Sequence, residues 1–192
     1  MDLTPSFVFC LIVLVLEIVG LSMSIRKRKW KVFLYYTQLS NMLTAVSALL
    51  LMVFSFLGIR AGWVTVLRYL STCMLVMTFF VTTCVLIPMG GDPKRLLWSG
   101  NGLFHHILCP VLSSFSYIGL EEHAGPVWIW LPVAVTLVYG LLMLFLNWKR
   151  KISGPYPFFR VYSQTARDTV KWMTALVFLI FLIAFFVWLA GR

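Results

Sequence analysis

The stretch from Phe7 to Ser24 reads FVFCLIVLVLEIVGLSMS, and the residues that follow it, Ile25 to Lys31, read IRKRKWK. The first stretch carries one charged residue, Glu17, and is close to the length of about 20 mostly apolar residues that a bilayer-spanning helix needs. A basic run next to an apolar segment is typical of the cytoplasmic end of such a helix. The pattern therefore predicts a transmembrane α-helix that ends at a cluster of positive charge.

The same pattern recurs along the whole chain. Hydrophobic residues make up 61% of the 192 residues and charged residues 11%, a composition too apolar for a soluble domain. Polar turns separate six apolar segments, at residues 7–24, 32–57, 64–89, 101–120, 127–146 and 169–190. We therefore predict an all-α fold, in which residues 1–192 form a single domain of six transmembrane helices packed as one bundle.

Lysine and arginine gather in alternate loops. Thirteen of the 16 basic residues fall in or beside the loops after the first, third and fifth segments. Because cytoplasmic loops carry an excess of positive charge, we expect the N-terminus outside and these loops in the cytoplasm. The net charge of +10 is spread in short clusters between apolar segments, so we expect it to face lipid headgroups and not nucleic acid.

Cysteine and histidine give no sign of a cofactor. The cysteines all fall within apolar segments, where we expect free thiols and no disulfide framework: Cys10, Cys73, Cys84 and Cys109. The histidines lack carboxylates or thiols at ligand spacing, so no metal site is predicted: His105, His106 and His123.

Segment two carries a polar stripe. Its members recur at steps of three and four, which puts them on one face of a helix: Thr37, Ser40, Asn41, Thr44 and Ser47. In hydrocarbon such a face turns toward the bundle interior or a water-filled cavity. Two explanations stay open for the stripe, packing of helices through small polar side chains and a functional site.

Two further segments bring polar residues to the same level. Thr78 and Thr82 lie toward the basic end of segment three, and His105 and His106 follow the start of segment four. At a rise of 1.5 Å per residue, Thr37 and His105 both lie roughly 6 to 8 Å below the basic boundary. The histidine pair has its own structural explanation, since it could simply bond neighbouring helices.

Pro110 and Glu17 sharpen the local picture. Pro110 cannot donate the hydrogen bond that the His106 carbonyl normally accepts, which predicts a kink or a bound water beside the histidines. Glu17 is the one carboxylate deep within a predicted span, and an intramembrane acid is by default a candidate functional residue. It could orient a histidine or bond a backbone group.

Three short motifs carry a family resemblance. They are FLYYTQLSN at Phe33 to Asn41, HHILCP at His105 to Pro110, and GPYPF at Gly154 to Phe158. In order and spacing they resemble the androgen-induced-gene type membrane proteins, whose animal members hydrolyse fatty acid esters of hydroxy fatty acids. The chain departs from the animal pattern in its reduced loops, in Cys109 where leucine is usual and in its doubled histidine, and these departures bear mainly on the substrate.

The resemblance implies acyl transfer within the membrane and no cofactor. Thr37 matches the family's nucleophile and His105, not His106, matches its general base. Thr37 would attack the carbonyl of a fatty acid ester of a membrane lipid while His105 accepts and returns the proton. On position, Gln38, Asn41 and Thr82 are candidate oxyanion donors.

This assignment requires Thr37 and His105 to approach within about 3 Å directly, or 5 to 6 Å through a water. His106, about 100° further round the helix, is expected to face a different neighbour. Two rival functions stay open: a lipid acyltransferase, in which another acceptor replaces water, and a non-catalytic membrane carrier or scaffold.

Overall fold

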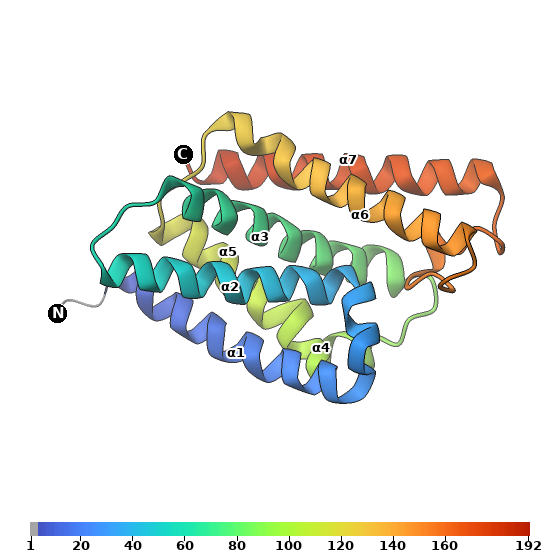
Figure 1. Cartoon of the computed structure of the whole chain (residues 1–192), viewed down its shortest axis with the longest axis horizontal. Helices are drawn as coiled ribbons and strands as arrows, with labels where there is room; N and C mark the ends of the chain where they lie inside the picture. Colours follow the sequence, from blue (N-terminus) through green and yellow to red (C-terminus); the bar gives the residue numbers. More distant parts are fainter. Residues whose placement is uncertain (1–3) are drawn as a thin grey trace.

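The computed structural model describes residues 4–192, and every regular element in that range is a helix (Figure 1). Six helical stretches are long and apolar enough to cross a membrane: Pro5–Leu34, Tyr36–Phe56, Gly62–Leu86, Asn101–Leu120, Pro126–Trp148 and Ala166–Ala190. The all-α polytopic bundle predicted from hydropathy is therefore confirmed.

The first two helices meet in a tight turn. Helix α1 (Pro5–Arg28) begins at an N-cap where the Thr4 side chain accepts a hydrogen bond from the Phe7 N–H, with Pro5 at its first position. A 3₁₀ helix, η1 (Lys29–Leu34), connects it to α2 (Tyr36–Phe56). The basic run is therefore helical, and α2 starts at Tyr36, four residues later than predicted.

The next two spans contain π-helical turns. Helix α3 (Gly62–Val81) continues into the π turn η2 (Thr82–Leu86), and the short π turn η3 (Lys94–Trp98) lies in the loop that follows. The fourth span consists of α4 (Asn101–Leu103), the π turn η4 (Phe104–Leu108) and α5 (Cys109–Leu120). The π turn η4 covers both neighbouring histidines and ends two residues before Pro110, where the α-helical hydrogen-bond ladder loses a donor.

The last two spans form a pair. The 3₁₀ turn η5 (Pro126–Ile129) leads into α6 (Trp130–Trp148), and the 3₁₀ turn η6 (Pro157–Phe159) precedes α7 (Ala166–Ala190). Helices α6 and α7 pack on each other and on α3 (Figure 1). On the opposite side of α3, helix α1 packs on both α2 and α5. Helix α3 is central: 61% of its span is buried, against 28–33% for the other five.

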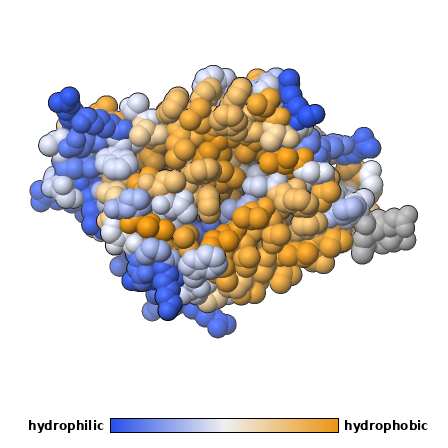
Figure 2. Space-filling model, turned by 180° about the vertical axis from the view of Figure 1, so that it is seen from behind, coloured by the Kyte–Doolittle hydropathy of each residue, from blue (hydrophilic) through white to orange (hydrophobic). Residues whose placement is uncertain are grey.

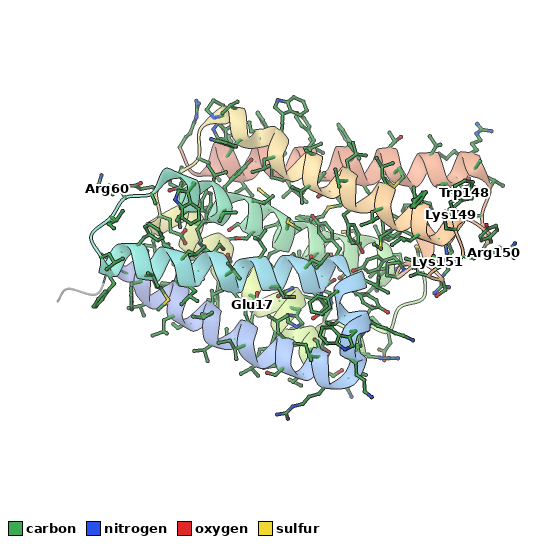
Figure 3. All side chains as sticks on the ribbon, viewed as in Figure 1. Glu17, Arg60, Trp148, Lys149, Arg150 and Lys151 are labelled. Carbon is green, nitrogen blue, oxygen red and sulfur yellow. The ribbon has the colours of Figure 1, made fainter. Side chains whose placement is uncertain are left out.

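Polar and apolar surfaces are separated as a membrane requires. Figure 2 shows a broad hydrophobic belt between more hydrophilic ends. Figure 3 places Trp148, Lys149, Arg150 and Lys151 at one end of the bundle and Arg60 at the other. Lys27, Arg28 and Arg95 line a cavity together with Tyr156 of the α6–α7 loop, so the basic loops meet at the first of these ends, here called the basic end. A multi-pass membrane protein fits this surface.

A buried ion pair holds the opposite half together. The Arg68 guanidinium donates to both carboxylate oxygens of Glu121, at 2.9 and 2.8 Å, and the Ser116 hydroxyl donates to the same carboxylate at 2.7 Å. Both side chains are enclosed, with 0% and 2% of their surface exposed, and each neutralises the charge of the other in the bundle interior.

Candidate functional site

The start of α2 is capped by two tyrosine hydroxyls. The first N–H groups of a helix have no partner within it. Here the Tyr36 N–H donates to the Tyr139 hydroxyl at 3.1 Å, and the Thr37 N–H donates to the Tyr156 hydroxyl at 3.3 Å. The Tyr156 hydroxyl also lies 3.2 Å from Oγ1 of Thr37. The candidate nucleophile is therefore bound to the α6–α7 loop through both its backbone and its side chain.

The GPYPF segment holds Tyr156 in place. Gly154 has a φ of +78°, a conformation that favours glycine, and Pro157 starts the 3₁₀ turn that follows Tyr156. The Tyr156 ring stacks on Phe158 with centroids 5.3 Å apart and meets the edge of Tyr35 at 5.9 Å. Burial raises the pKa of the Tyr156 phenol, so at neutral pH it remains an O–H group that can donate a hydrogen bond.

The rest of the stripe joins α2 to α3. Oγ of Ser40 lies 3.1 Å from Oγ1 of Thr78, and the Ser47 and Ser71 hydroxyls lie 2.9 Å apart. Thr44 donates to the Ser40 carbonyl within its own helix. Helix packing therefore accounts for this part of the stripe, and Thr37, at its end, is the member that reaches a cavity.

An apolar crevice lies between α2, α3, α6 and α7. Its free volume is about 40 Å³, and its walls include Thr37, Thr78, Thr82 and Tyr156. The remaining lining is largely hydrophobic and comes from the following residues: Tyr36, Met77, Val81, Leu86, Thr136, Tyr139, Gly140, Phe158, Phe159, Met173, Leu176 and Val177. A narrow, mostly hydrophobic slot of this kind suits a hydrocarbon chain.

A second, larger space, here called the basic-end cavity, has a volume of about 520 Å³. Its lining mixes apolar residues with polar and positively charged ones, which include Lys27, Arg28, Gln38, Arg95, Asn101 and His106. Thr37, Tyr156 and Leu86 line both this cavity and the apolar crevice. The Thr37 side chain therefore lies at the junction of an apolar space and a basic one.

The two histidines face different surroundings. His105 is fully buried, with Nε2 3.1 Å from Oγ of Ser24 and Nδ1 3.5 Å from Oε2 of Glu17, and it contributes to neither of these spaces. His106 is half-buried, lines the basic-end cavity, and has Nδ1 3.0 Å from Oγ1 of Thr82. Thr37 is hydrogen-bonded to Tyr156, and among the described contacts none joins it to His105.

Ser24 joins His105 to two other groups. Oγ of Ser24 donates to the Gly20 carbonyl at 2.9 Å and accepts from Nδ2 of Asn101 at 2.8 Å. With its proton given to Gly20, Ser24 is positioned to accept a further hydrogen bond from the tautomer of His105 that carries its proton on Nε2. Nδ1 of His105 and both carboxylate oxygens of Glu17 are buried and have no hydrogen-bond partner within residues 4–192. Figure 3 shows Glu17 midway along the bundle, far from both ends.

The remaining predicted site residues divide between these places. Gln38 is buried, lines the basic-end cavity, and its Oε1 has no hydrogen-bond partner within residues 4–192. The Asn41 side chain donates to the Thr37 carbonyl. Thr37, Gln38, Thr82 and His106 thus gather around the two spaces.

Sequence reasoning gave no role to Tyr156 or Ser24. Tyr156 stood within a quoted motif, which was the available signal, whereas Ser24 ended an apolar stretch with nothing to single it out. Within residues 4–192, the structure groups no three histidine, cysteine or acidic side chains as a metal site.

Known proteins add no identification. The chain matches no protein-family model, and no curated protein or solved structure gives a match. The family resemblance of the three motifs, and the roles that it implies for Thr37 and His105, therefore remain predictions.

Proposed function

We propose that this chain is an intramembrane hydrolase of fatty acid esters, with Thr37 as its nucleophile. The observation that carries the proposal is the position of Thr37, which lines both the apolar crevice and the basic-end cavity. A lipid ester has the same two parts, a hydrocarbon chain and a polar group joined at a carbonyl. With the chain in the crevice and the polar group in the cavity, the ester carbonyl lies beside the Thr37 hydroxyl.

The narrow crevice must widen to admit a chain. Two of its walls are methionines, Met77 and Met173, whose unbranched side chains repack readily. Gly140 gives Met173 its room, because a Cβ at this glycine would lie 2.6 Å from the Met173 methyl carbon. Movement of Met173 is therefore the simplest way to lengthen the crevice.

The chemistry divides into two acyl transfers. In the first step, Oγ1 of Thr37 forms a bond to the ester carbonyl carbon while a histidine takes the proton of the Thr37 hydroxyl. The carbon–oxygen bond to the leaving alcohol then breaks, and the histidine gives that proton to the alcohol. The acyl group is left on Thr37. Water from the basic-end cavity then attacks the acyl carbon, which releases the fatty acid and returns a proton to Thr37.

The base is the point on which geometry and resemblance differ. The resemblance gives the role to His105, whose nitrogens face Ser24 and Glu17. The cavity favours His106, which lines it and whose Nδ1 lies 3.0 Å from Oγ1 of Thr82. In the tautomer that donates from Nδ1 to Thr82, Nε2 carries the lone pair that accepts a proton. We therefore assign the base to His106 and treat His105 as its rival.

The experiment is hydrolysis by the purified protein in lipid nanodiscs, with mass spectrometry of the protein to find an acyl adduct. Thr37→Val should abolish turnover and the adduct, whereas Thr37→Ser should keep part of both. Thr44→Val is the matched control, because Thr44 is buried on the same stripe but bonds its own helix and lines neither space. Wild-type turnover by Thr37→Val would refute the proposal.

The same experiment separates the rivals. Products that carry the acyl group on an alcohol or amine instead of the free acid would identify an acyltransferase. Binding of the ester without any adduct or product would identify a carrier. His106→Ala should reduce turnover far more than His105→Ala, and the opposite order would return the base to His105.

A further inference from the structure

The two tyrosines that cap α2 use their protons differently. The Tyr139 hydroxyl accepts from the Tyr36 N–H and donates to the Leu34 carbonyl at 2.7 Å, so its proton is committed to the backbone. The Tyr156 hydroxyl accepts from the Thr37 N–H and lies 3.2 Å from Oγ1 of Thr37, and no described contact commits its proton to the backbone. Tyr156 therefore holds an O–H group beside the candidate nucleophile that is free to donate to a substrate.

This arrangement brings two donors to the place where an ester carbonyl must lie. The first is the Thr37 N–H, which belongs to the first turn of α2 and carries the positive partial charge of a helix N-terminus. The second is the Tyr156 O–H, whose burial keeps it protonated. The first turn of α2 holds no acidic residue to oppose a developing negative charge.

A second feature marks this helix end as a place where a polar group can bind. Gln38, the next residue of α2, has a side chain that is 4% exposed and lines the basic-end cavity. Its Oε1 has no hydrogen-bond partner within residues 4–192. A buried amide left unpaired is costly, so its position on the cavity wall suits an incoming donor such as water or the leaving alcohol.

We propose that Tyr156 is a catalytic residue, and that its O–H and the Thr37 backbone N–H together form the oxyanion hole. The inference rests on the proposed function. As Oγ1 of Thr37 bonds to the carbonyl carbon, the electron pair of the C=O π bond moves to the oxygen. That oxygen takes the place of the Tyr156 hydroxyl as acceptor of the Thr37 N–H and also accepts from Tyr156. When the leaving alcohol departs with the proton from the base, the pair returns and the carbonyl re-forms.

The alternative is that Tyr156 only fastens the α6–α7 loop to α2. Tyr139 provides the comparison, because it caps the adjacent N–H of the same helix, lines the same crevice and has no proton free for a substrate. A structural role for both hydroxyls predicts parallel losses in Tyr139→Phe and Tyr156→Phe. An oxyanion role predicts that they diverge.

The test measures kcat, KM and thermal stability of both variants in nanodiscs, with the fatty acid ester that the wild type turns over. Tyr156→Phe should lower kcat roughly 10²- to 10³-fold with KM changed no more than a few-fold, as for other oxyanion donors. Tyr139→Phe should lose at least as much thermal stability, but its kcat should fall at least roughly ten-fold less than that of Tyr156→Phe. If Tyr156→Phe keeps kcat within about three-fold while Thr37→Val is inactive, the oxyanion role is wrong and the hydrolase proposal stands.

A second substitution covers the case in which Tyr156→Phe fails to fold. Replacement of Tyr156 by 3-fluorotyrosine retains the hydroxyl and the packing but makes the phenol a stronger acid. A donor to a developing anion predicts a changed kcat with an unchanged melting temperature. An unchanged kcat in this variant would overturn the assignment. Turnover that persists in Thr37→Val would instead refute the proposed function itself.

Discussion

Removal of the charge on Glu121 should destabilise the bundle strongly. Arg68 and Glu121 are joined by two hydrogen bonds of 2.9 and 2.8 Å, and their side chains are 0% and 2% exposed. Glu121→Gln leaves the guanidinium charge enclosed without a counter-charge, and breaking a buried ion pair in this way costs about 3 to 5 kcal/mol. The loss extends to Ser116, which donates to the same carboxylate.

The double variant separates an unpaired charge from lost packing. Arg68→Met combined with Glu121→Gln removes both charges while filling much the same volume, and such replacements are often neutral or stabilising. We therefore expect the double variant to regain most of the stability that Glu121→Gln loses. Arg60→Ala is the surface control, since its ion pair with Glu122 is exposed and at 3.5 Å.

The assay is reversible unfolding in mixed micelles, followed by circular dichroism as the fraction of denaturing detergent rises. The free energy of unfolding is compared among the wild type, both single variants, the double variant and the surface control. The reasoning would be refuted by a Glu121→Gln protein within about 1 kcal/mol of wild type, well below the cost of a broken buried pair. It would also fail if the double variant were no more stable than Glu121→Gln.

Three further predictions follow from other contacts. Gly20→Ala should lower the melting temperature and displace the His105 ring, because the new Cβ would lie 2.8 Å from its Cε1; an unchanged ring signal in NMR spectra would contradict this. Because burial raises the pKa of Tyr156 in the folded protein, the unfolded chain binds fewer protons above the ordinary phenol pKa of about 10, so above about pH 10 wild type should lose more stability with rising pH than Tyr156→Phe, and parallel melting curves would exclude it. Cysteines placed at Arg60 and Arg150 should react with membrane-impermeant reagents from opposite sides of the bilayer, with Arg150 reached from the cytoplasm; labelling of both from one side would reject the orientation.

Hydropathy predicts the fold well because the bilayer imposes it. Each span must bury its own backbone hydrogen bonds over a fixed thickness, so a run of apolar residues specifies a helix with little help from the rest of the chain. The periodicity of the α2 stripe likewise predicts its inward face, and Ser40 and Ser47 do bond α3. Predicted and observed structure differ at the ends of the spans, where the membrane no longer dictates the conformation. The basic run before Tyr36, which is helical, is one example.

The sequence did not predict which side chains bond to each other. The position of a residue in a helix predicts the depth of its side chain in the membrane, but not its direction in a π turn. Such a turn, η4, contains an extra residue per turn and so alters the directions of its side chains. His105 consequently bonds Ser24 of α1, and His106 bonds Thr82 of the π turn η2. Arg68 and Glu121 are 53 residues apart in sequence, so nothing local announces their pairing. The contact of Tyr156 with Thr37 depends in the same way on a loop that comes to the start of α2 from a distant part of the chain.

The tight turn between α1 and α2 has a consequence for how the protein is made. The two helices pack on each other and are joined by η1, so they form a helical hairpin. The basic residues between Arg26 and Lys31 lie at the tip of this hairpin. A polar stripe such as that of α2 is costly to expose to lipid alone, and a basic tip resists transfer across the bilayer. We therefore expect α1 and α2 to leave the insertion machinery together, with α1 shielding its partner until α3 is synthesised.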